Sequence, residues 1–197
     1  MRAYLRIGTA LALAVATGGC ALLGGGGKPP PVLFTLSSDA PPAAAARTAA
    51  VGQTVTIATP VIPKQLRTVR VPVEIGLTQV QYVANLQWVD TPDRLFQALL
   101  EETVRRTTNR VVLDPSQTTL DPGLVVSGQL NRFGYDTQQG VVVVQYDGSL
   151  ATQGGTHVES RRFEATVPAD GTAATVSPAL NEAANQVAKQ VAQWIGG

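Results

Sequence analysis

Cysteine and histidine are nearly absent from this chain of 197 residues, which contains one of each, Cys20 and His157. A zinc site built from these residue types needs three or four ligands, so a single chain cannot form one. One cysteine excludes an intramolecular disulfide and leaves no Cys–His nucleophile pair in the folded body. Aromatic residues make up only 5% of the sequence, too few for a platform that stacks ligands. The composition predicts neither a metal nor a cofactor.

A surplus of charge of either sign is also lacking. The 15 Lys and Arg residues against 14 Asp and Glu leave a formal net charge of +1. Binding to phosphates needs an excess of basic side chains on one face, so a nucleic-acid partner is excluded. The sequence contains no G-x-S-x-G elbow, P-loop, G-x-G-x-x-G or H-E-x-x-H motif, and its carboxylates are scattered. We therefore predict that the protein is not an enzyme.

The first twenty residues predict export from the cytoplasm. Arg2 and Arg6 precede an apolar run from Ile7 to Ala16, and small residues lead on to Cys20. This arrangement is typical of a secretory signal peptide. A membrane-anchoring helix is the alternative, but its apolar stretch would need roughly 20 residues.

Cys20 lies where the signal peptide would be cleaved. The position resembles a bacterial lipobox, with Gly18 and Gly19 before the cysteine and Thr17 in place of the usual Leu. The resemblance implies a lipoprotein signal peptide over residues 1–19 and acyl chains, palmitate among them, on Cys20. Several acyl chains, at about 0.8 kcal/mol per buried CH₂, give stable attachment. Cleavage elsewhere, with loss of the cysteine, is the alternative.

Composition divides the rest of the chain into a tether and one domain. Residues 20–31 include four glycines followed by a lysine and three prolines, and this mixture predicts a flexible, then extended, tether. Fully extended, residues 21–31 reach about 35 Å. Residues 32–197 form the predicted single domain, in which Ala40–Ala50 is expected to be a surface loop.

Alternating apolar residues predict six to eight strands in this domain. Val55 and Ile57 alternate with threonines, as on a half-buried strand. Val69, Val71 and Val73 form a second strand, which Pro72 makes either an edge strand or a bulged one. Further strands are expected over Val80–Ala84, Arg110–Leu113, Leu124–Tyr135, Gly140–Thr152 and Val158–Val167.

Two segments have helical periodicity instead. Thr91 and Pro92 begin the first helix, with ion pairs expected four residues apart on its polar face. Ser177 and Pro178 are expected to begin the second helix, which ends at Gly196 and has an alanine-rich apolar face. The fold class that we predict is α+β: a largely antiparallel sheet with two amphipathic helices packed on one face, preceded by the signal peptide and flexible tether.

Several side chains allow a structural and a functional interpretation. Trp88 comes just before the first helix and can pack against its first turn or serve as an exposed anchor for another protein. Arg161 and Arg162 point to opposite faces of one strand, so at least one of them should be exposed or at an interface. His157 is expected at the start of that strand or in the preceding loop.

These features together carry a resemblance to a known family. They are the lipobox, a short Phe34-Thr35-Leu36 strand, a Pro-x-x-Leu element from Pro63 to Leu66, and Trp88 just before the leucine-rich helix. The chain resembles the ABC-type transport auxiliary lipoproteins, which are PqiC-like or YmbA-like proteins. The resemblance covers most of the chain from Cys20 to Ile195.

The resemblance implies an accessory role. Such lipoproteins accompany ABC-type systems whose periplasmic subunits carry mammalian-cell-entry (MCE) domains, with a permease and an ATPase, and which move phospholipids or other apolar molecules between the inner and outer membranes. It implies that Cys20 anchors the domain in the outer membrane, facing the periplasm, because Ala21 rather than Asp follows it. Leu66, Tyr82 and Trp88 are the candidate docking residues. A homo-oligomer is a further candidate assembly. The alternatives are an envelope assembly or structural lipoprotein, and a hydrolase with an unrecognised site.

Overall fold

A computed structural model describes residues 32–43, 48, 50, 52–117, 123–152 and 157–196. All of them belong to one compact unit, Val32–Gly197, which is separate from the unit Met1–Pro31. The signal peptide, Cys20 and the tether lie outside the described residues. The helices are α1 (Pro92–Thr107) and α2 (Ala173–Gly196), and two short 3-10 turns are η1 (Lys64–Leu66) and η2 (Pro115–Gln117). The strands are β1 (Leu33–Phe34), β2 (Thr54–Ile57), β3 (Arg70–Ile75), β4 (Gln79–Trp88), β5 (Val111–Leu113), β6 (Leu124–Asp136), β7 (Val141–Thr152) and β8 (His157–Pro168).

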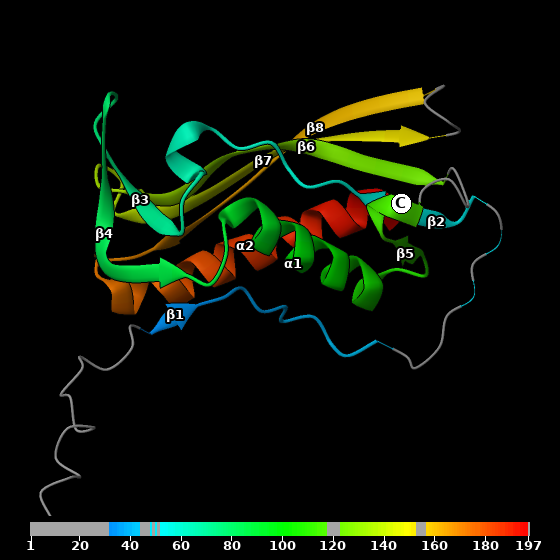
Figure 1. Cartoon of the computed structure of the whole chain (residues 1–197), viewed down its shortest axis with the longest axis horizontal. Coiled ribbons are helices and arrows are strands. Elements are labelled where there is room, and N and C mark those ends of the chain that lie inside the picture. The colour runs from blue at the N-terminus through cyan, green and yellow to red at the C-terminus, as the bar shows by residue number, and fades with distance from the viewer. Residues whose placement is uncertain are drawn as a thin grey trace, which may run out of the picture. The chain divides into compact units, whose positions relative to one another are not determined.

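The predicted α+β class is confirmed. The described strands form one sheet in the order β1-β4-β3-β6-β2-β5, and β7 and β8 extend from β6. The long pairs β3–β4, β6–β7 and β7–β8 are antiparallel. The parallel pairs are short and join β1 to β4, β2 to β5, and β6 to β2 and β3. Figure 1 shows both helices on one side of the β6–β7–β8 layer.

Strand β6 joins the two parts of the sheet. Its first residues pair with β2, its last residues pair with β3, and β7 pairs along its length. On β7, which pairs with β6, the run Val141–Val144 lacks alternation and is mostly buried, as expected of a strand covered on both faces. The apolar sides of α1 and α2 meet the sheet in one core, which is rich in alanine along α2.

The prediction for β2 was wrong in one respect. All four of its residues are buried, including Thr54 and Thr56, which alternation had placed on an exposed face. Strand β2 lies between β5 and β6, which pair with both of its edges, and Thr54 and Thr56 are only 8% and 4% exposed. Alternation of polar and apolar residues in a short strand therefore does not show whether its polar face is exposed to solvent or covered by other residues.

The hairpin of β3 and β4 was predicted in part. The bulge at Pro72 is confirmed, because the register shifts between Arg70 and Pro72. Strand β4 is longer than expected and continues to Trp88. Its periodicity breaks at Asn85, which has a φ of 57°, so that Leu86 and Trp88 return to the buried side. A positive φ permits this local change of direction.

Helix α1 begins where predicted, with Thr91 before it and Pro92 as its first residue. The ion pairs Arg105–Glu101 and Arg106–Glu102 are present at 3.1 and 2.5 Å. Phe96, Leu99, Leu100 and Val104 are buried in the core.

The predicted start of α2 was wrong. The helix begins at Ala173, and Pro178 lies inside it. An Asp170 network forms the true start: its carboxylate accepts hydrogen bonds from the Thr172 N–H at 2.9 Å, the Thr172 hydroxyl at 2.7 Å and the Thr175 hydroxyl at 2.5 Å. Pro178 is the sixth residue of the helix and lies beyond its first turn, so its missing N–H removes one hydrogen bond of the helix.

Asp170 makes the stability of the domain depend on pH. The hydroxyls of Thr175 and Thr172 and the Thr172 N–H lower its pKa from 3.8 to about 2. A lowered pKa in the folded state stabilises the fold above the unfolded-state pKa, and this contribution is lost as the pH falls from about 4 to about 2. We therefore expect wild type to lose more thermal stability than Asp170→Asn between these pH values. Thermal unfolding followed by circular dichroism from pH 6 to pH 2 measures the difference, and parallel curves for the two proteins would contradict it.

Candidate docking surfaces

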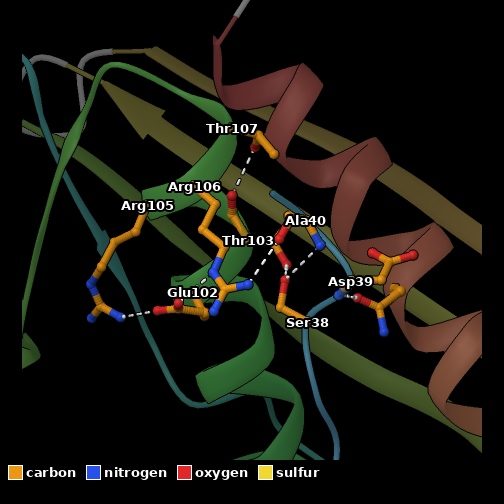
Figure 2. Close-up of polar contacts among 9 residues, drawn as sticks. Ser38, Asp39, Ala40, Glu102, Thr103, Arg105, Arg106 and Thr107 are labelled. Atoms are coloured by element: carbon orange, nitrogen blue, oxygen red, sulfur yellow. Dashed lines mark hydrogen bonds and ion pairs between the residues drawn. The ribbon is translucent and has the colours of Figure 1, made fainter. Parts of the chain in front are cut away.

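The chain enters the folded body through an extended segment, residues 35–40, which we call the strap. It follows β1, whose residues Leu33 and Phe34 pair with Gln87 and Trp88 of β4. The strap then passes between α1 and α2 (Figure 2). Phe34 and Leu36 pack against the core, and the strap thereby links β4, α1 and α2.

Helix α2 holds the strap by its backbone. The Oδ1 atom of Asn181 accepts a hydrogen bond from the Ser37 N–H at 2.8 Å. The Asn185 amide makes two such bonds: Oδ1 accepts from the Asp39 N–H at 3.0 Å, and Nδ2 donates to the Ser37 carbonyl at 2.8 Å. Lys189 completes the row, with its Nζ 2.7 Å from the Asp39 carboxylate. Spacing of four residues places these three side chains on one side of the helix.

Helix α1 holds the other side. The hydroxyl oxygens of Ser38 and Thr103 lie 3.2 Å apart, and Nη1 of Arg106 donates to the Ala40 carbonyl at 2.8 Å. Arg106 is oriented by Glu102, whose pKa it lowers through their hydrogen bond. The strap is thus fixed from both helices, as Figure 2 shows.

The candidate docking residues occupy two environments. Leu66 and Trp88 are each only 1% exposed and belong to the core, where the Trp88 ring lies 5.8 Å from that of Phe133. Tyr82 is half-buried at the surface of β4, and the Arg70 guanidinium lies over its ring at 4.2 Å. Its hydroxyl donates to the Gln65 carbonyl at 3.4 Å, which places Tyr82 over the turn that contains Leu66.

The tip of the β3–β4 hairpin carries exposed apolar side chains. Leu77 is 98% exposed and Val80 is 45% exposed, while Tyr82 lies further along the same strand as Val80. We call Leu77, Val80, Tyr82 and Arg70 the hairpin surface. Exposed apolar side chains grouped with an aromatic and an arginine are typical of protein interfaces.

The face of the sheet opposite the helices is polar. Arg162 makes two hydrogen bonds to Asp147, at 2.6 and 2.8 Å, and they lower the pKa of that carboxyl group. Arg132 pairs with Glu74 and, at 2.9 Å, with Asp136. Burial acts to raise the pKa of Asp136, but the hydrogen bonds from Arg132 and from two backbone N–H groups outweigh it and lower the pKa. Both Arg161 and Arg162 are exposed, in agreement with the prediction that at least one would be.

In the part of the chain that the structure describes, no three His, Asp or Glu residues lie close enough together to hold a metal ion. His157 is exposed and begins β8, as expected. An open cleft of about 740 Å³ lies where the two helices end, and both apolar and charged side chains line it. Among the charged ones, Arg110 donates a hydrogen bond to the Ile195 carbonyl. None of the described helices has the length and apolarity to span a bilayer.

Comparison with known families matches residues 34–192 to the ABC-type transport auxiliary lipoprotein component. The chain belongs to this family. Comparison with curated proteins gives no match for this auxiliary lipoprotein. The match begins in β1 and ends in α2, so it includes the strap, both helices and the sheet.

Solved structures show the same fold at low identity. A Xanthomonas campestris protein of the family DUF330 is 15% identical, with a TM-score of 0.64 over 84% of this chain and 92% of its own. An uncharacterized protein is also 15% identical, with a TM-score of 0.60 over 83% of this chain and 99% of its own. A PelC dodecamer from Paraburkholderia phytofirmans is 13% identical, with a TM-score of 0.46 over 81% and 96%, too low to inform the assembly of this auxiliary lipoprotein.

Sequence reasoning did not find the strap. The signal that could have revealed it is Asn185, an amide in the middle of the apolar face of α2 and only 1% exposed. A buried amide needs hydrogen-bond partners, and here an extended segment supplies them.

Proposed function

We propose that this auxiliary lipoprotein is a non-catalytic docking subunit. Acylated Cys20 anchors it in the outer membrane, residues 20–31 act as the tether, and the folded domain faces the periplasm. There it binds the MCE-domain protein of an ABC-type system, together with the permease and ATPase, that moves phospholipids or other apolar molecules between the two membranes. Apolar molecules must be shielded from water in transit, and a docked subunit shortens the aqueous gap.

Family membership over residues 34–192 is the observation that carries this proposal. The strap supports it, because it joins the anchored end of the chain to both helices and the sheet. We assign docking to the hairpin surface. Within it Tyr82 contacts the partner, while Leu66 and Trp88, which are buried, hold the hairpin and the η1 turn in place from the core side.

A pull-down from mildly detergent-solubilised membranes tests the function. Tagged wild type should recover an MCE-domain protein, a permease and an ATPase, identified by mass spectrometry. Cys20→Ala should lose outer-membrane fractionation, because the acyl chains provide the attachment. Leu77→Asp with Tyr82→Ala should keep the fractionation and lower recovery of the MCE-domain protein at least tenfold, since both side chains lie at the surface.

Matched controls separate docking from folding. Val158→Asp alters an exposed apolar residue on β8, far along the chain from the hairpin surface, and should leave recovery unchanged. Recovery of a barrel protein or assembly machinery in place of the transport proteins would contradict the proposal. It would favour a role in envelope assembly.

A further inference from the structure

The strap is held chiefly by polar contacts, several of which are partly buried. Its backbone is bound by side chains of the helices and not by a strand ladder. Thr35, Ser37 and Asp39 are exposed, and Leu36 and Ser38 are partly buried. The strap follows a β1–β4 pairing of two residues. Such a segment contrasts with β7, which pairs with β6 and β8 along most of its length.

This difference gives the strap a low local stability. Segments with few buried apolar contacts open at a free energy well below that of global unfolding. The apolar contribution here comes chiefly from Phe34, Leu36 and Ala40. A pull applied at the anchored end of the chain acts on β1 and the strap before it acts on any other described element.

Asn185 makes the opening a discrete step. Its amide nitrogen donates to the carbonyls of Ser37 and Asn181, each at 2.8 Å, and its oxygen accepts from Asp39. When the strap loosens without leaving, two of these bonds are lost while the segment still shields Asn185, which is 1% exposed in the seated state. A buried polar group without its partners is unfavourable, so the strap favours the fully seated state over a half-released one.

We propose that the strap is a releasable latch that sets the length of the tether. In the seated state, residues 21–31 span the distance from the anchor, about 35 Å when extended. Release of β1 and the strap as far as Gln53 adds residues 32–53, which extend by about a further 70 Å. The strands from β2 onward and both helices stay folded. This latch rests on the proposed function, because the pull requires acylated Cys20 and a docked partner.

A disulfide lock tests the latch in cells. Ser38→Cys with Thr103→Cys places two sulfurs where hydroxyl oxygens are now 3.2 Å apart, and the mature anchor cysteine is acylated and does not compete. The lock is combined with deletion of residues 24–30, which shortens the tether. Because tether length limits binding only while the membranes are intact, the partners are cross-linked in cells before detergent is added. With a native strap, we expect the deletion to lower recovery of the cross-linked MCE-domain protein less than twofold. With the oxidised lock, we expect a loss of at least tenfold, and a reducing agent should reverse it.

Equal losses from the deletion in the native and locked proteins would overturn the latch, and so would no loss in either. Absence of the transport proteins from the pull-down of full-length wild type is a different result and contradicts the proposed function itself.

Amide hydrogen exchange on the mature lipoprotein in detergent micelles tests release without a partner. The N–H groups of Ser37 and Asp39 should exchange at least tenfold faster than those of Val142 and Val144 on β7. Asn185→Ala should increase the exchange rate of these strap N–H groups about tenfold further. Gln186→Ala, the neighbouring control, should leave that rate unchanged. Exchange of the strap at the rate of β7 would show that the strap opens only on global unfolding and would overturn the latch.

Discussion

Trp88→Ala is expected to lower the free energy of unfolding by about 3–5 kcal/mol, the range for removal of a large buried aromatic side chain. Trp88 is 1% exposed and is among the largest fully buried side chains in the described residues. It packs beside Phe133, with the ring centroids 5.8 Å apart. Its removal leaves a cavity beside Phe133 of β6. Equilibrium unfolding in urea, followed by circular dichroism, measures the loss.

Trp88→Phe separates packing from hydrogen bonding at this position. The indole Nε1 of Trp88 is buried and has no hydrogen-bond partner among the described atoms. Phenylalanine keeps an aromatic ring against Phe133 and leaves a smaller cavity than alanine does. It also removes the unpaired N–H group, and this gain partly offsets the free-energy cost of the cavity. We expect the free energy of unfolding to fall by less than about 1.5 kcal/mol. A loss as large as that of Trp88→Ala would show that the indole nitrogen makes a bond essential to the fold.

The same residue shows what a sequence can and cannot predict about the candidate site. The sequence alone predicts that Trp88 lies just before the Thr91–Pro92 helix start, and a tryptophan at that position is compatible with either a core role or a docking role. Burial depends on β4 reversing its pattern at Asn85, whose φ of 57° is a local backbone property that alternation does not reveal. Tyr82, only six residues earlier, therefore stays at the surface. The hairpin surface and the strap emerge only when the strands are placed in space.

The fold was more predictable where one period continues over a long segment. The start of helix α1 and both ends of the strands β6, β7 and β8 were predicted within one or two residues, because each carries ten or more residues of one pattern. The start of α2 was misplaced because Ser177-Pro178 matches a helix start as well as Asp170 and Thr172 do. The Asp170 network determines the outcome through hydrogen bonds to Thr175, three residues beyond Thr172. Short parallel contacts such as β3–β6 leave no periodic signal at all.

The β3–β6 contact is too close to admit an added side chain. Gly134 on β6 faces Pro72 on β3 so closely that a Cβ atom would lie 2.4 Å from the Pro72 carbonyl oxygen and 2.9 Å from its Cγ. The first of these is a backbone atom, so no change of rotamer relieves the overlap. Gly134 is not among the glycines with positive φ, and alanine would fit its backbone angles. Steric contact is therefore the sole cause of the expected effect.

Gly134→Ala should lower the free energy of unfolding by about 3 kcal/mol, the upper end of the usual cost of overpacking. The added methyl group must move β3 away from β6, where Val73 pairs with Tyr135 and Glu74 pairs with Asp136. That pairing also positions Glu74 beside Arg132, so the ion pair is lost with it. Urea unfolding measures the loss of unfolding free energy. Faster amide exchange confined to β3 and β4 would show that the destabilisation lies in this hairpin.

Gly196→Ala provides the matched control, because a Cβ there meets Thr108 at 3.5 Å, an ordinary contact distance. Its free energy of unfolding should stay within about 0.5 kcal/mol of wild type, as for substitutions that disturb no packing. If Gly134→Ala behaved like this control, β3 would have to be free to move away from β6 at little cost. The hairpin surface would then be held by β1 and the core side chains, chiefly Leu66 and Trp88, and not by the sheet.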